Sequence, residues 1–361
     1  MAKAKSLLAG SQRVVLLLCL LALGSQCTQQ AVEKKADGPC LIKQVDETSV
    51  NSGAGIETMT NTRGITYTYN AAGLPIQVME HYTQQTPKQG IITDYTTENT
   101  YAYDAAAYLT DAQFTARYKT QNDAGSWGSR TTNSYTDGRL SEQITRSLSA
   151  TGITADDMKT YAYDASGALV RIVQRTVYQN VPDSLKEKAP YADKSESIWT
   201  YQNGRATDYV VRTNGVDTRP YILQNGLVQR TTQGDRQYSD TYDAQDRLAK
   251  REVRVNGVLE STEERSYSAA KSATSTWPAF KGVPAYAGSG CTSCELASLS
   301  YRKLLSNGGY FTTTMTAQVK TNGAGFVQSV DEIDTHTNYD SRGSSYQIRT
   351  SRTYTYDGTC N

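Results

Sequence analysis

A short motif recurs along the chain and constrains its fold more than any other feature. Each copy reads Tyr-x-Tyr-Asp/Asn, then a turn that usually ends in Gly, then an apolar residue. Alternate strand residues share a face, so the two tyrosines of a copy point the same way. The Asp or Asn side chain can bond the backbone two residues on, and Gly takes the left-handed conformation that closes the turn. Each copy therefore predicts a β-hairpin.

Copies of this motif follow one another along most of the chain. The clear copies begin at Tyr67, Tyr101 and Tyr161, and a last copy begins at Tyr354. Ala107 stands where the other copies have Gly, and we expect a different turn there. Between residues 203 and 257, Asn-Gly pairs and related turns lie about ten residues apart. This spacing predicts two-residue turns and strands of about eight residues.

Composition supports a sheet. The 361 residues include 26 Tyr but only four Phe and three Trp, and Tyr suits a pleated, half-buried surface. Only residues 294–305 have a moderately helical pattern. Sequential strands joined by short turns form an antiparallel meander. We predict an all-β fold, an antiparallel hairpin-repeat meander curled into a large barrel or half-barrel.

The ordered motif Tyr-x-Tyr-Asp-x-x-Gly-x-Leu resembles the YD (Rhs-type) repeat, over about half of the mature chain from Ile65 to Leu259. In that family the repeats wind a β-ribbon into a hollow shell, often around a toxin. This chain is too short for a full shell and has no recognisable toxin domain. It is more similar to the small YD-repeat lipoproteins of bacterial envelopes. The resemblance implies the fold and transfers no catalytic residue.

Residues 1–26 have the pattern of a signal peptide. Lys3, Lys5 and Arg13 precede a ten-residue apolar run, which is too short to span a bilayer. Because Cys27 follows, the segment resembles a bacterial lipoprotein signal, in which Cys27 is acylated and residues 27–39 form a tether. We predict an outer-membrane lipoprotein of the cell envelope, held to the membrane by its N-terminal lipid. The alternative is ordinary cleavage after Gly24 and secretion.

The remaining chain divides by composition. Residues 40–272 hold the hairpin repeats, residues 273–297 form a Pro/Gly/Ser-rich connection, and residues 298–361 add strands that complete the same sheet. Four cysteines remain after lipidation, and an even number suits an oxidising compartment. A redox role for the Cys-x-x-Cys pair would need a βαβ context, which is lacking. We predict two disulfides; three pairings are open, and the favoured one bonds Cys40 and Cys360 each to one of Cys291 and Cys294.

No motif for catalysis, metal or cofactor binding is recognisable. The 37 basic and 36 acidic residues nearly balance, which argues against a nucleic-acid partner. His81 and His336 are the two histidines, and we expect both to be ordinary polar strand residues. The acidic cluster Asp331, Glu332 and Asp334 is expected to be solvated. An enzyme would instead need a cleft with perturbed carboxylates near Asp331 or His336.

The tyrosines of the repeats are the remaining candidates for a site. They form either a Tyr-built core or a wall that faces a ligand, since Tyr combines an apolar ring with a polar tip. The candidates are Tyr67, Tyr69, Tyr101, Tyr103, Tyr161, Tyr163 and Tyr201. We predict a non-enzymatic scaffold or binding module whose protein or glycan partner is unknown. The alternative is a carrier of a hydrophobic or glycan ligand in a Tyr-lined barrel cavity.

Overall fold

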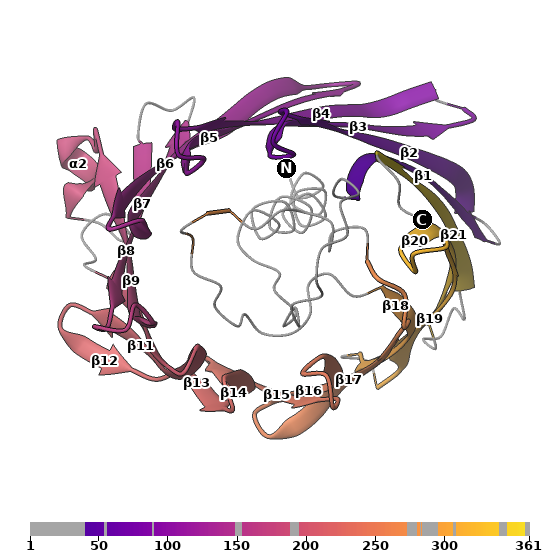
Figure 1. Cartoon of the computed structure of the whole chain (residues 1–361). Helices are drawn as coiled ribbons and strands as arrows, with labels where there is room; N and C mark the ends of the chain where they lie inside the picture. The colour runs from indigo at the N-terminus through magenta and orange to yellow at the C-terminus, as the bar shows by residue number, and fades with distance from the viewer. Residues whose placement is uncertain are drawn as a thin grey trace.

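The chain folds into one curled antiparallel β-sheet, as the repeat predicts (Figure 1). This is a computed structural model, and it describes residues 40–53, 56–88, 90–148, 154–187, 195–272, 280–281, 283, 295–305, 308–338 and 345–357. Its strands are β1 (Leu41–Gly53), β2 (Ile56–Tyr69), β3 (Pro75–Thr86), β4 (Gly90–Tyr103), β5 (Leu109–Thr120), β6 (Ala124–Thr136), β7 (Arg139–Leu148), β8 (Thr154–Tyr163), β9 (Leu169–Gln179), β10 (Ser195–Gln202), β11 (Arg205–Thr213), β12 (Val216–Thr218), β13 (Tyr221–Gln224), β14 (Leu227–Gln233), β15 (Arg236–Tyr242), β16 (Leu248–Val255), β17 (Val258–Tyr267), β18 (Leu296–Leu304), β19 (Tyr310–Thr321), β20 (Val327–Asn338) and β21 (Ser345–Asp357). One short helix, α2 (Asp183–Lys186), follows β9.

The sheet is ring-shaped because its two ends meet. Each strand from β1 to β11 pairs with the next, and so does each strand from β13 to β20. The first strand, β1, also pairs with the last, β21, from Leu41↔Asp357 to Gly53↔Tyr346. In the described chain, only the step from β12 to β13 lacks a ladder.

The Asp/Asn turns form as the sequence predicts. In the first copy, Oδ1 of Asn70 accepts hydrogen bonds from the amides of Ala72 and Leu74, each 3.0 Å long. Equivalent pairs of bonds reach Asp104, Asp164, Asp243 and Asn322. Two-residue turns such as Asn203-Gly204 have positive φ at both positions. The side chain of the turn residue thus fixes each hairpin locally.

The expectation of a different turn at Ala107 is wrong. Ala107 has φ of 67° and donates its amide to the carbonyl of Asp104, over 3.0 Å. Gly73, Gly167 and Gly325 make the same bond in their turns with φ of 75°, 88° and 81°. The hydrogen bonds to the side chain of Asp104 and the flanking strands therefore hold Ala107 in a left-handed conformation. This conformation costs a non-Gly residue about 1–2 kcal/mol.

Replacing Ala107 with Gly is expected to stabilise the protein by about 0.5–1 kcal/mol. The relief of left-handed strain exceeds the extra chain entropy that Gly has when unfolded. Urea unfolding followed by circular dichroism measures the change. The matched reverse variant is Gly325→Ala, because its φ is 81° and no atom lies within 4 Å of an added Cβ. It should lose a similar amount, and stabilisation by both variants would refute the assignment to backbone strain.

The second tyrosine of a hairpin ties that hairpin to the strand before it. The hydroxyl of Tyr69 at the end of β2 donates to the carbonyl of Ile42 near the start of β1, over 2.7 Å. Six further tyrosines at strand ends make the same bond to the preceding strand. They are Tyr103 to Pro75, Tyr135 to Leu109, Tyr163 to Leu140, Tyr242 to Val228, Tyr267 to Leu248 and Tyr356 to Val327. We call these contacts the Tyr–carbonyl bonds.

Two segments differ from the sequence predictions. In the segment 294–305, the described residues 295–305 do not form a helix: β18 occupies Leu296–Leu304 and pairs with β17 and β19. The stretch between Gly215 and Asn225 is not one strand of about eight residues, because it divides into β12 and β13 around Arg219 and Pro220. Proline has no amide hydrogen and cannot donate to a ladder, which ends pairing at this point.

The core lies along the tyrosine face of the sheet, where strand alternation places it. One cluster comprises Leu140, Tyr161, Leu169, Ile172, Tyr201 and Ala206, and another comprises Ile42, Val45, Ile65 and Val78. On β2, Ile65 is buried and Tyr67 is half-buried, whereas Thr66 and Thr68 on the opposite face are exposed. The predicted alternation between two faces is confirmed on this strand.

Candidate functional site

The tyrosine face is the inner wall of the ring. A short piece of the 273–297 connection lies inside the ring in Figure 1, where it contacts this face. The ring of Phe280 lies 6.1 Å from that of Tyr101 and 6.4 Å from that of Tyr103, between centroids. Val283 packs against the Leu140 cluster. Lys281 donates to the carbonyl of Ala106 over 2.9 Å and lies 4.4 Å above the ring of Tyr108.

The seven candidate tyrosines all belong to this wall, but they differ in access. Tyr161 and Tyr201 are 7% and 6% exposed, so they are core residues. Tyr67, Tyr69, Tyr101, Tyr103 and Tyr163 are half-buried. The hydroxyls of Tyr69, Tyr103 and Tyr163 are engaged in Tyr–carbonyl bonds. Burial raises the pKa of Tyr67 to about 12, so its hydroxyl stays protonated at neutral pH.

One open hollow includes two of the candidates. It has a volume of about 540 Å³ and is lined by Leu41, Lys43, Tyr67, Tyr69 and the Asn70–Gly73 turn. Rings, a lysine and a turn backbone offer both apolar and polar contacts here. The hollow lies where β1 enters the sheet beside β2.

A second band of aromatic residues was not predicted as a site. Tyr82, Tyr95 and Tyr118 are opposite one another on β3, β4 and β5. The ring of Trp127 on β6 lies 5.7 Å from Tyr95 and 5.9 Å from Tyr118, and all four residues are half-buried. Tyr95 shares the strand parity of Tyr101, which is the signal that could have placed this band on the same wall.

Charged residues form a continuous row across five strands of the wall, from β3 to β20. Nε of Arg63 bonds Oε1 of Glu80 over 2.6 Å, and Arg63 pairs with Glu47 across the β1–β2 ladder. Nε of Arg352 bonds Oε2 of Glu47, also over 2.6 Å. Nη1 of Arg352 lies 3.5 Å from Oε2 of Glu332. Glu80 is only 2% exposed, so this row is part of the interior rather than a solvated surface.

The expectation that the acidic cluster is solvated is wrong for two of its three members. Burial raises the pKa of Glu332 and of Asp334, while Arg352 opposes the rise. Burial likewise raises the pKa of Glu295. Asp331 faces the other way and accepts a hydrogen bond from Oγ of Ser351 over 2.8 Å. Adjacent residues of β20 face opposite sides, as predicted. Because the sheet curls into a ring, however, the side with Glu332 and Asp334 lies in the interior.

Replacing Asp334 with Asn is expected to stabilise the protein by about 1 kcal/mol at pH 8. The raised pKa means that folding disfavours the ionised carboxyl, so the parent loses stability as the pH rises from the unfolded to the native pKa of Asp334, and the loss is complete above the native pKa. The advantage of the variant should shrink as the pH falls through that pKa. Urea unfolding at pH 8 and pH 5 measures it. Asp331→Asn is the control, and an equal gain in that variant would contradict the interpretation.

His336 is more than an isolated polar residue. Its ring stacks on Tyr346, with centroids 4.5 Å apart, and on Phe311 at 5.8 Å. Its Nδ1 lies 2.9 Å from Oγ1 of Thr313, and burial lowers its pKa. His81, by contrast, is exposed and pairs with Asp94 on the surface, in line with the prediction. His336 thus joins an aromatic row beside the buried carboxyls.

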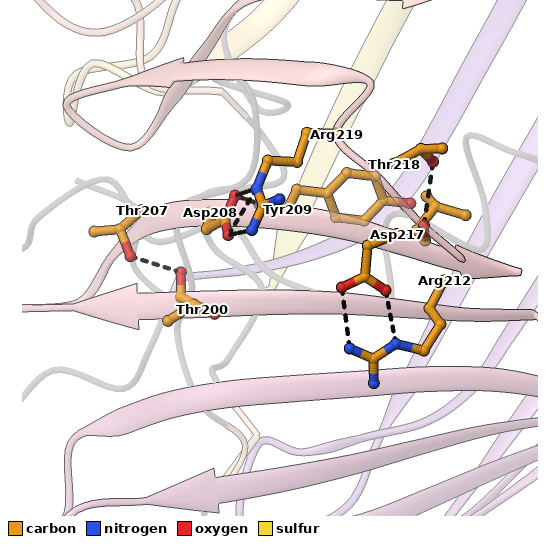
Figure 2. A network of polar contacts seen from close by, with 9 residues as sticks. Thr200, Thr207, Asp208, Tyr209, Arg212, Asp217, Thr218 and Arg219 are labelled. Carbon is orange, nitrogen blue, oxygen red and sulfur yellow. Dashed lines mark hydrogen bonds and ion pairs between the residues drawn. The ribbon is translucent and has the colours of Figure 1, made fainter. Parts of the chain in front are cut away.

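The segments β12 and β13 follow one another beside β11, but only β12 pairs with β11 through a ladder. Side chains hold β13 to β11, and we call this place the β11–β13 joint (Figure 2). The rings of Tyr209 on β11 and Tyr221 on β13 stack 4.5 Å apart at 18°, and Trp199 on β10 contacts both. The guanidinium of Arg219 bonds both carboxylate oxygens of Asp208 over 3.2–3.3 Å. Side-chain contacts replace a ladder here. Besides the stack and the Arg219–Asp208 pair, Arg205 of β11 bonds the carbonyl of Asn225 and the carboxylate of Asp246, and Leu223 of β13 packs against the buried cluster of Leu140.

Asp208 has a second role at this joint. Its Oδ1 accepts the amide hydrogen of Tyr209 over 3.0 Å, so its own side chain satisfies a backbone group of β11. A similar ion pair lies in the neighbouring β11–β12 hairpin, where Arg212 bonds Asp217 over 2.7 and 3.1 Å. That hairpin has a ladder as well, with Arg212 opposite Asp217. The two ion pairs therefore differ in whether backbone pairing supports them.

Several predicted features fall outside the described residues. The signal, Cys27 and the tether lie there, as do Cys291, Cys294 and Cys360. Cys40 is disulfide-bonded, and its partner lies outside the described part, so the favoured pairing stays a prediction. Within the described ranges, no helix is long and apolar enough to cross a membrane. No group of three His, Cys, Asp or Glu residues there is arranged to hold a metal ion.

Comparison with known proteins assigns no family. No family model matches the chain, and no curated protein matches it. Among solved structures, it is similar to a porin-like protein from Bacteroides uniformis ATCC 8492, at 12% identity and a TM-score of 0.36. That match covers 88% of this chain and 96% of the other. A likeness this distant carries no functional argument.

Proposed function

We propose that the chain is an exported, lipid-anchored protein of the cell envelope whose β-ring is a non-enzymatic scaffold or binding module. The observation that carries the binding role is the inner wall, on which half-buried aromatic rings alternate with hydroxyl and amide groups. The polar outer face of strands such as β2 is compatible with an aqueous setting. The row of buried carboxyls is explained by its pairing with Arg63 and Arg352, without a reacting substrate.

A carrier of a hydrophobic or glycan ligand is the second candidate. It is favoured by the band of Tyr82, Tyr95, Tyr118 and Trp127, because rings with polar tips suit amphipathic ligands. Native mass spectrometry of the purified protein distinguishes the two. A reproducible bound mass that is lost on Trp127→Ala supports the carrier, whereas an apo mass from freshly prepared protein supports the scaffold.

The lipid anchor has its own test. Mass spectrometry of the N-terminal peptide from membranes should show an acylated Cys27, and Cys27→Ser should release the protein from the membrane fraction. An unmodified peptide that begins at Ser25 would instead establish cleavage after Gly24 and secretion.

A further inference from the structure

We propose that the β11–β13 joint is a lateral opening through which the ring admits molecules to its inner wall. This inference concerns the ring itself and goes beyond the proposed binding role. Among the described strands, every other pair of neighbours in the ring shares a hydrogen-bonded ladder. The ring should therefore part where backbone pairing is absent.

The contacts at the joint are of a kind that breaks and re-forms easily. Arg219 and Asp208 are 61% and 39% exposed, and solvent weakens an ion pair at that exposure. Tyr209 and Tyr221 contact each other through ring faces, which can separate without loss of any backbone hydrogen bond. Pro220 lacks the amide that a ladder would need, so the strands cannot form one at this residue.

Opening requires Arg205 to release the carbonyl of Asn225, but two other backbone groups at the joint keep their partners. The Tyr209 amide already bonds the side chain of Asp208 rather than a strand across the joint. On the other side, the carbonyl of Pro220 accepts the amide of Thr232 on β14, over 2.9 Å. Both edges therefore keep these partners when they move apart, which lowers the cost of opening.

An opening in the side of the ring has a consequence for what can enter. A long unbranched molecule can pass sideways between β11 and β13, whereas entry from one end requires threading. The first groups that it would meet inside are the rings of Trp199, Tyr209 and Tyr221. Ile222, which is 54% exposed and adjacent to Tyr221 on β13, points to the opposite face.

Distances between two nitroxide labels test the opening directly by pulsed electron spin resonance. The joint pair is Arg171→Cys with Arg230→Cys, on exposed sites of β9 and β14, which lie on either side of the joint. The control pair is Gln113→Cys with Arg171→Cys, on exposed sites of β5 and β9, between which every neighbouring pair of strands has a ladder. Labelling conditions are those under which the parent protein takes no label. We expect one narrow distance for the control pair and two populations for the joint pair.

Matched substitutions assign the longer distance to the joint. Asp208→Ala should raise the longer population about two- to fivefold, the effect expected for loss of a weak exposed ion pair. Arg219→Ala removes the other partner of the same pair and should act alike. Asp217→Ala removes the laddered Arg212–Asp217 pair and should change nothing. A joint pair as narrow as the control in all variants, or an equal response to Asp217→Ala, would overturn the proposal.

Discussion

Replacing Leu140 with Ala is expected to lower the free energy of unfolding by about 3 kcal/mol, within the range for buried Leu→Ala substitutions. Leu140 is fully buried at the centre of the cluster that joins β7 to β11. The ring holds the surrounding strands in register, so they cannot close around the cavity that the substitution leaves. The loss of stability should therefore not fall to the low end of the range for Leu→Ala substitutions. The carbonyl that Tyr163 bonds belongs to the backbone and remains.

Chemical unfolding monitored by tryptophan fluorescence measures this loss. Leu259→Ala is the control, because Leu259 is 40% exposed and the same atoms are removed. It should lose less than about 1 kcal/mol, since the solvated part of its side chain contributes little burial. Equal losses in the two variants would show that the inner wall is not a packed core.

Replacing Arg352 with Met is expected to cost about 3 kcal/mol at pH 8. The guanidinium is 26% exposed and lies between Glu47 and Glu332, so its removal leaves carboxylates without their cation. Burial raises the pKa of Glu295, Glu332 and Asp334, and Arg352 opposes that rise in each case. In the variant these pKa values rise further, so the native state takes up protons more readily as the pH falls.

The deficit of this variant should therefore shrink between pH 8 and pH 5, since protonation removes the uncompensated charge. Urea unfolding at both pH values measures it. Arg130→Met is the control, because Arg130 is 62% exposed and pairs with Asp111 on the surface. It should cost less than about 1 kcal/mol at either pH. A deficit for Arg352→Met that does not depend on pH would contradict the electrostatic explanation.

The sequence predicts the hairpins well because their chemistry is local. An Asp or Asn beside a small residue determines its own turn, and the alternation of Tyr and Thr determines the two faces. The prediction was wrong at Ala107 because the surrounding hairpin imposes a left-handed conformation that an alanine alone disfavours. The break at Arg219-Pro220 was readable, because proline interrupts a ladder wherever it falls.

The row of charged residues from β3 to β20 and the β11–β13 joint both depend on the register between strands, which sequence spacing does not determine. Glu47 and Arg352 are 305 residues apart and meet only because β1 pairs with β21. Glu332 looked solvated because nothing local shows that its strand faces an interior. Asp208 and Arg219 are near in sequence, but their role depends on the absence of a neighbouring ladder.

The Tyr–carbonyl bonds imply how such a ring could change its circumference during evolution. Each bond reaches only the strand immediately before it. Duplication or loss of one complete hairpin would therefore carry its bond along and leave the others unaltered. Repeat proteins whose units contact only their neighbours tolerate such changes in copy number. The size of the ring is then determined where its first and last strands meet, and not by the individual repeats.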